Sequence, residues 1–162
     1  MKKAPFDQDF FIDATLAFGE PKLKQTLAYW DAKRGSRVAP KRIDIDAREA
    51  KAFLPDMQLF EIVDGGRAIR ARLIGTAIVR LANEDVTGQE FDDTSPRKIV
   101  HRVLRAVRWV IEHRKPLRTF AERTALENKE FLSHEALLLP LSNDGATIDM
   151  IAVVGVFKPA TG

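Results

Sequence analysis

The stretch Met150-Ile151-Ala152-Val153-Val154-Gly155-Val156-Phe157 carries no charged or strongly polar side chain at any position. Side chains of a β-strand point alternately to its two faces, so a strand of this composition must be covered on both sides. The sequence therefore predicts that the strand over residues 147–157 lies in the middle of a sheet. We expect its neighbour to be the strand over residues 58–63.

Four further strands are predicted around this stretch. The strands over residues 58–63 and 69–74 flank Asp64-Gly65-Gly66, which is typical of a hairpin turn. The strands over residues 117–126 and 132–141 precede the central strand, with turn residues after each of them. Hairpins of this kind predict a five-stranded antiparallel sheet.

Charged side chains indicate which strands lie at the edges, because an exposed edge tolerates charge better than the middle of a sheet. The strand over residues 69–74 contains Arg70 and Arg72, and the strand over residues 117–126 contains Arg118. We therefore expect these two strands at the edges.

Two longer helices are predicted by their end signals. Pro21 suits the first turn of a helix that Gly35 terminates, and a long connector helix over residues 95–114 ends before Pro116. Short helices are expected from Asp46 to just before Pro55, and from residue 76 to residue 83. Strands placed around a helical block are typical of an α+β fold.

The N-terminal helix has a narrow apolar stripe of Leu23, Leu27 and Trp30. Such a stripe packs one flat surface, so it lies either against the outer face of the sheet or against a second copy in a homodimer. We expect one domain over residues 20–158, with a loosely docked arm over 1–19 and a short tail over 159–162.

Composition excludes several classes of protein. The 162 residues contain no cysteine, which rules out disulfides, thiolate metal sites and the flavin photochemistry that forms a cysteine adduct. No apolar stretch approaches the roughly 20 residues of a spanning helix, and acids after Met-Lys-Lys interrupt any leader-like segment. These features predict a cytoplasmic protein.

The layout resembles a PAS domain: two strands, short helices, a long connector helix and three strands. The residues that carry the resemblance are Tyr29-Trp30, Lys33-Arg34-Gly35, Ile43-Asp44-Ile45-Asp46, Leu54-Pro55, Arg72-Leu73-Ile74-Gly75-Thr76, Asp85-Val86-Thr87-Gly88 and Leu139-Pro140-Leu141-Ser142-Asn143-Asp144-Gly145. They are similar to a bacterial subfamily whose members often consist of a single PAS domain. The resemblance implies sensing or docking in signalling, often as a homodimer, and names no cofactor.

In a PAS fold the ligand cavity lies between the sheet and the helices on one of its faces. The residues that we expect to line it are Phe60, Val100, Val103, Leu104, Val107, Leu137 and Met150. This lining is apolar, so the ligand is expected to be a small, largely apolar molecule. The alternative is that the same side chains fill the space as an ordinary core.

The polar side of the connector helix carries a basic stripe of Arg97, His101, Arg105, Arg108 and Trp109. We interpret it either as a solvated face or as a docking surface for an acidic protein partner or an anionic membrane surface. Nucleic acid is a weaker alternative, because this helix lies flat on a sheet and offers one aromatic side chain for stacking.

Catalytic and metal chemistry find little support. The three histidines His101, His113 and His134 are better explained as solvated or capping residues than as haem ligands. No nucleophile elbow, phosphate loop or paired histidine motif is present. The sequence favours a non-catalytic sensory or regulatory protein, with a small-molecule-converting enzyme as the alternative.

Overall fold

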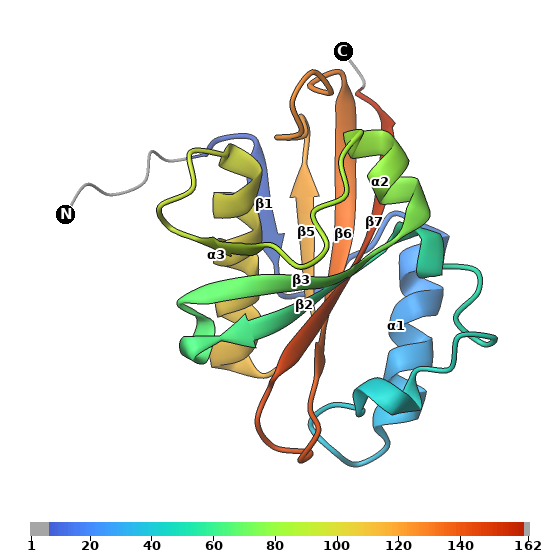
Figure 1. Ribbon diagram of the computed structural model, residues 1–162. Coiled ribbons are helices and arrows are strands. Elements are labelled where there is room, and N and C mark those ends of the chain that lie inside the picture. The colour runs from blue at the N-terminus through green and yellow to red at the C-terminus, as the bar shows by residue number, and fades with distance from the viewer. Residues whose placement is uncertain (1–6, 161–162) are drawn as a thin grey trace.

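The computed structural model describes residues 7–160, which form one antiparallel seven-stranded sheet in the order β1-β5-β6-β7-β2-β3-β4 (Figure 1). The strands are β1 (Phe10–Asp13), β2 (Met57–Val63), β3 (Ala68–Ile74), β4 (Glu90–Asp92), β5 (Leu117–Ala121), β6 (Leu132–Leu141) and β7 (Met150–Pro159). The described residues also contain the α-helices α1 (Pro21–Arg34), α2 (Thr76–Ala82) and α3 (Lys98–His113). The predicted α+β class is confirmed.

Strand β7 lies at the centre of the sheet, between β6 and β2, as its composition predicts. Its register places Val153 opposite Leu138 on β6, and Ile151 opposite Phe60 on β2. Ile151 and Val154, which face opposite sides, are both fully buried. Burial on both faces therefore accounts for the position of this strand.

The prediction of five strands was wrong, because β1 and β4 extend the sheet at both ends. Strand β1 lies within the residues expected to form a loose arm and pairs with β5. Strand β4 pairs with β3, so neither β3 nor β5 is an edge. The added strands supply the partners of the charges: Asp13 lies 3.2 Å from Arg118, and Glu90 lies 2.8 Å from Arg70. The charges that suggested an edge in fact form cross-strand ion pairs.

Helices α3 and α1 cover opposite faces of the sheet (Figure 1). Leu23 and Trp30 of α1 are buried within their own chain, and the Trp30 indole N–H donates to the carbonyl of Pro140 at 2.8 Å. Leu27 is half-buried. Of the two arrangements expected for this stripe, the described residues adopt packing against the sheet.

The start of α1 is fixed by a carboxylate on β6. Glu135 accepts hydrogen bonds from the backbone N–H of Gly19 and of Glu20, and it pairs with Arg118 at 2.9 Å. These hydrogen bonds and the positive Arg118 lower the pKa of Glu135 although its burial acts in the opposite direction. Pro21 follows in the first turn, and Gly35 ends the helix with a φ of 61°.

The short helix expected between Asp46 and Pro55 is absent, and turns followed by a 3-10 turn over Leu54–Asp56 take its place. The Asp46 side chain still accepts from the backbone N–H of Arg48 and Glu49, as a helix cap would. Helix-like hydrogen bonds run from the Ala50 N–H to the Asp46 carbonyl and from the Leu54 N–H to the Ala50 carbonyl, so the backbone makes separate turns rather than a continuous helix.

Gly75 joins β3 to α2 where the chain passes against the 3-10 turn at Leu54–Asp56. Its N–H donates to the carbonyl of Met57 at 2.7 Å, and a Cβ at this position would lie 2.2 Å from the carbonyl oxygen of Pro55. Only glycine therefore permits this approach of two backbones.

We predict that Gly75→Ala lowers the free energy of unfolding by about 1–3 kcal/mol, because backbone must move to admit the methyl group. The control is Gly19→Ala, whose Cβ would meet the Glu135 carboxylate at an ordinary 3.6 Å. Urea unfolding of both variants measures the difference. Equal unfolding midpoints would contradict this description of the junction.

Candidate ligand cavity and the surface of helix α3

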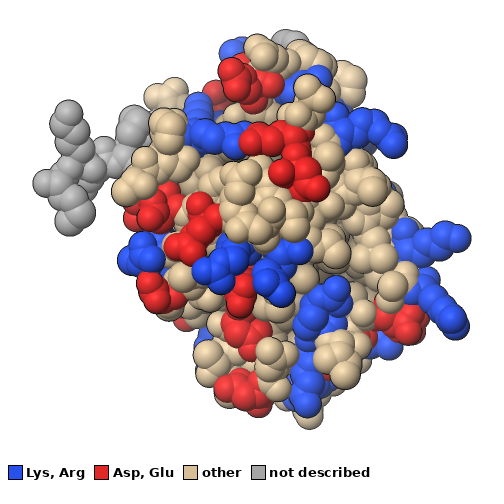
Figure 2. Space-filling view, in the orientation of Figure 1, with Lys and Arg blue, Asp and Glu red and all other residues tan. Residues whose placement is uncertain are grey.

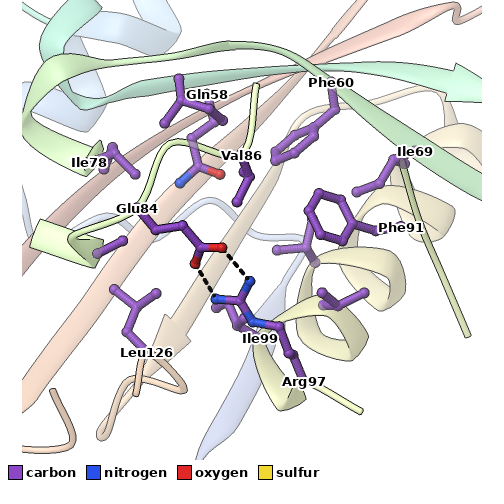
Figure 3. A pocket seen from close by; sticks show the side chains of 14 residues that line it. Gln58, Phe60, Ile69, Ile78, Glu84, Val86, Phe91, Arg97, Ile99 and Leu126 are labelled. Carbon is purple, nitrogen blue, oxygen red and sulfur yellow. Dashed lines mark hydrogen bonds and ion pairs between the residues drawn. The ribbon is translucent and has the colours of Figure 1, made fainter. Parts of the chain in front are cut away.

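A cavity lies between α3 and the sheet, and it contains about 590 Å³ of space not filled by atoms, part of it open to solvent. The lining residues come from β2, β3, α2, β4, α3, the segments between α2 and α3, and the connection from β5 to β6: Gln58, Phe60, Ile69, Ile74, Ile78, Ala82, Glu84, Val86, Phe91, Arg97, Ile99, Val100, Val103 and Leu126. In Figure 3, Phe60, Ile69 and Phe91 lie on one side and Ile78 and Leu126 on the other. Most of the wall is apolar.

A β-bulge shapes the wall that β3 contributes. Gln58 pairs with Ile74 and Phe60 pairs with Ala71, so Arg72 is an extra residue without an opposite partner. The bulge brings Ile69 and Ile74, which strict alternation would place on opposite faces, to the same cavity. Because alternation alone gives the wrong face for one of them, sequence reasoning missed this pair.

Three of the seven residues predicted to line the cavity do so: Phe60, Val100 and Val103. Leu104 and Val107 are fully buried in the core and do not reach the cavity wall. Leu137 and Met150 were assigned to the wrong face of the sheet. Leu138, next to Leu137, faces α3, while Met150 has the same alternation as Ala152, which faces α1.

The mouth of the cavity carries its charged residues. Arg97 immediately precedes α3, and its guanidinium donates to both carboxylate oxygens of Glu84, at 3.0 and 3.5 Å. Figure 3 shows this pair between the two groups of apolar side chains. Gln58 on β2 adds a half-buried amide to the wall.

A second cavity adjoins the first along α3, with about 460 Å³ of space partly open to solvent. Ile99, Val103 and Leu126 line both cavities. The further wall of the second cavity includes Phe10, Arg102, Thr119, His134, Ala136, Val153 and Phe157. The two spaces therefore follow one face of the same helix.

His134 was expected to be readily solvated, but it lies against the second cavity. Its ring stacks on Phe157 with centroids 4.2 Å apart, and it covers Gly155, where a Cβ would lie 2.5 Å from the ring nitrogen Nε2. Burial, aided by the positive charge of Arg102, lowers the pKa of His134 to about 4. The imidazole is therefore neutral at physiological pH.

The N-terminal segment covers the outer side of the second cavity. The Asp7 carboxylate binds Arg102 through two hydrogen bonds of 2.6 and 3.0 Å, and Arg102 also donates to the carbonyl of Arg123. The Arg102 hydrogen bond and charge lower the pKa of Asp7. Phe10 lies beneath the guanidinium groups of Arg102 and Arg105. No pattern in the sequence predicts the pairing of Asp7 with Arg102.

The basic stripe on α3 is largely neutralised within the chain. Arg97 binds Glu84, and Arg108 binds Asp93 through two hydrogen bonds of 2.9 and 3.0 Å. Arg108 also donates to the carbonyls of Gly66 and Arg67. In Figure 2 positive and negative side chains are interspersed over the visible face, with no continuous basic patch.

The remaining stripe residues have different environments. His101 Nε2 lies 2.7 Å from the carbonyl oxygen of Ser95, while Arg105 is exposed and has no ion pair among residues 7–160. Trp109 is half-buried against the core and stacks on His113, with ring centroids 4.1 Å apart. The chain itself thus supplies much of the cover that a tryptophan on this side of the helix requires.

The segment over residues 84–95 links the cavity to this surface. Val86 and Phe91 line the cavity, while Glu84, Asp93 and the carbonyl of Ser95 bind the polar side of α3. The sequence suggested the cavity wall and the basic stripe as two separate sets of residues. This one segment contributes to the first set and binds the second.

Comparison with known families gives a match to the PAS domain over residues 19–157, which is most of the chain. The chain belongs to the PAS domain family. PAS domains are typical of sensory and signalling modules and are usually non-catalytic. Among curated proteins no match is found.

A solved structure similar to this PAS domain is described as a sensory box histidine kinase/response regulator from Burkholderia thailandensis E264. It is 13% identical, the match covers 72% of this chain and 86% of that chain, and the TM-score is 0.39. A likeness this distant adds nothing to the argument.

Within residues 7–160, no helix is long and apolar enough to cross a membrane, and no cluster of three metal-binding side chains occurs.

We predict that Arg108→Glu lowers the free energy of unfolding by about 1–3 kcal/mol, because it removes a clamp on two loops and places a carboxylate beside Asp93. Arg105→Glu makes the same charge change on the same helix and loses only the contact with the Phe10 ring, so it should alter stability by less than about 1 kcal/mol. Urea unfolding measures both. The clamp would be refuted by two variants that unfold at the same urea concentration.

Proposed function

We propose that this PAS domain is a sensory module that binds a small, mainly apolar molecule in the cavity between α3 and the sheet. The single observation that carries the proposal is the apolar lining, in which Gln58, Glu84 and Arg97 are the only polar side chains among fourteen. Burial of apolar surface is a strong driving force for binding, and a few polar groups select the orientation of a ligand.

We further propose that ligand occupancy reaches a protein partner through the segment over residues 84–95. The segment holds Val86 and Phe91 against the cavity and is tied to α3 by Glu84 and Asp93. A molecule that moves Phe91 would also move the carboxylate of Asp93, two residues later. The partner would contact this segment and the adjoining surface of Arg105 and Trp109.

Electrostatic attraction of an acidic partner has less support from the structure than from the sequence alone. Two of the four basic residues of the stripe are bound by acids of the chain, and a third hydrogen-bonds a backbone carbonyl. Exposed Arg105 remains as a free cation in the part of the chain that the structure describes. The proposed signal is therefore a change in the shape of the loop rather than attraction to a basic patch.

The proposal predicts that wild-type protein purified gently from its own cells carries a small molecule that Val103→Phe excludes. The larger ring takes up space beside Ile99 and Leu126, which line both cavities as Val103 does. Val156→Phe makes the same change on a half-buried residue that lines neither cavity, and it should retain the molecule. Native mass spectrometry of the three proteins, followed by extraction, measures this directly.

Adding the extracted compound back at about 100 times its Kd should raise the Tm of the wild type by roughly 5–10 °C, since only the folded state binds it. The Tm of Val103→Phe should not respond. If Val103→Phe retained the same compound as the wild type, the cavity would not be the binding site. If repeated extraction gave no compound from any of the three proteins, the space would be ordinary core.

A further inference from the structure

In the ion pair at the mouth of the cavity, another anion can take the place of Glu84 on Arg97. The carboxylate of Glu84 and the guanidinium of Arg97 face each other at 3.0 Å, and their side chains are 42% and 39% exposed. An ion pair this exposed contributes little to stability, because solvent screens both charges. A second carboxylate can therefore replace Glu84 on Arg97 at little energetic cost.

Arg97 is held more firmly in place than Glu84. Arg97 is the N-terminal cap of the sixteen-residue helix α3, which has neither a side-chain cap nor an acidic residue in its first turn. The positive end of the helix dipole there favours an anion. Glu84 lies in the loop after α2, next to Asn83, which has a left-handed φ of 55°. An incoming anion at Arg97 is therefore favoured over an incoming cation at Glu84.

Behind this mouth most of the wall is apolar, and the polar residues of the second cavity are Arg102, Thr119, Thr124 and His134. Ile99, Val103 and Leu126 border both cavities, so an extended chain that enters beside Arg97 reaches Ala136 and Val153 when these three side chains move aside. Each methylene group buried on such a path strengthens binding, because apolar surface leaves water. A charged end, in contrast, is best kept at the mouth, where solvent and Arg97 both reach it.

From these observations we propose that the ligand is a monocarboxylate with an alkyl chain of medium length. Its carboxylate replaces Glu84 on Arg97, and its chain follows α3 from the first cavity into the second. This inference rests on the proposed function, because it names the class of molecule that the same cavity takes. Binding of the carboxylate also separates Glu84 from Arg97. The loss of this contact is what changes the segment over residues 84–95.

The test compares decanoate, 1-decanol, decylamine and butanoate by isothermal titration calorimetry on the full chain. Decanoate should bind several-fold more tightly than decanol, which lacks the charge, and at least 10-fold more tightly than butanoate, which lacks the chain. Arg97→Gln should weaken decanoate several-fold and leave decanol unchanged. Glu84→Gln should strengthen decanoate several-fold, because it removes the competing carboxylate. Melting temperatures of both variants verify that they remain folded.

The possible outcomes distinguish a failure of the carboxylate site at Arg97 from a failure of the apolar cavity as a binding site. Equal binding of decanoate and decanol, both lost in Val103→Phe, would overturn the carboxylate at Arg97 while supporting an apolar site. Tighter binding of decylamine that depends on Glu84 would overturn it in favour of a cation. Absence of binding by all three decyl compounds would overturn the alkyl monocarboxylate, and copurification would then decide the proposed function independently.

Discussion

The burial of β7 on both faces is the constraint on which the rest of this fold depends. Ile151 faces α3 and Val154 faces α1, and each is fully buried. Neither face can be left to solvent without exposing a continuous apolar surface, so the chain must place a helix on each side of the sheet. Helix α1 covers its side with Leu23 and with Trp30, whose indole hydrogen bond to Pro140 fixes the packing, and it leaves a smaller space of about 350 Å³ there. Helix α3 covers the other side less completely, and the cavities lie there.

The position of β7, the ends of α1, the long connector helix and the PAS family could all be predicted from the sequence, because they rest on local patterns and their order. The outer strands could not. Residues 10–13 are too few to show a period, and the charge of Arg118 suggested an edge when its partner Asp13 lies far away in sequence. A charge shows that a partner is needed without showing which segment provides it.

The cavity was predicted in outline and missed in detail for a related reason. Phe60, Val100 and Val103 were identified from the faces of β2 and α3, while Leu137 and Met150 were placed one residue out of register. The bulge at Arg72, the short strand that holds Phe91, and the loop residues Val86 and Leu126 follow no periodic pattern. The same holds for the basic stripe, whose ion pairs with Glu84 and Asp93 depend on how the loop before α3 folds back.

The account depends most directly on an apolar space beneath α3, and xenon tests that space without knowledge of the ligand, because xenon occupies apolar cavities that side chains leave empty. Diffraction from crystals pressurised with xenon should show a bound atom beside Phe60, Phe91 and Val103. The absence of xenon anywhere between α3 and the sheet would mean that the space is filled core, and would contradict the account.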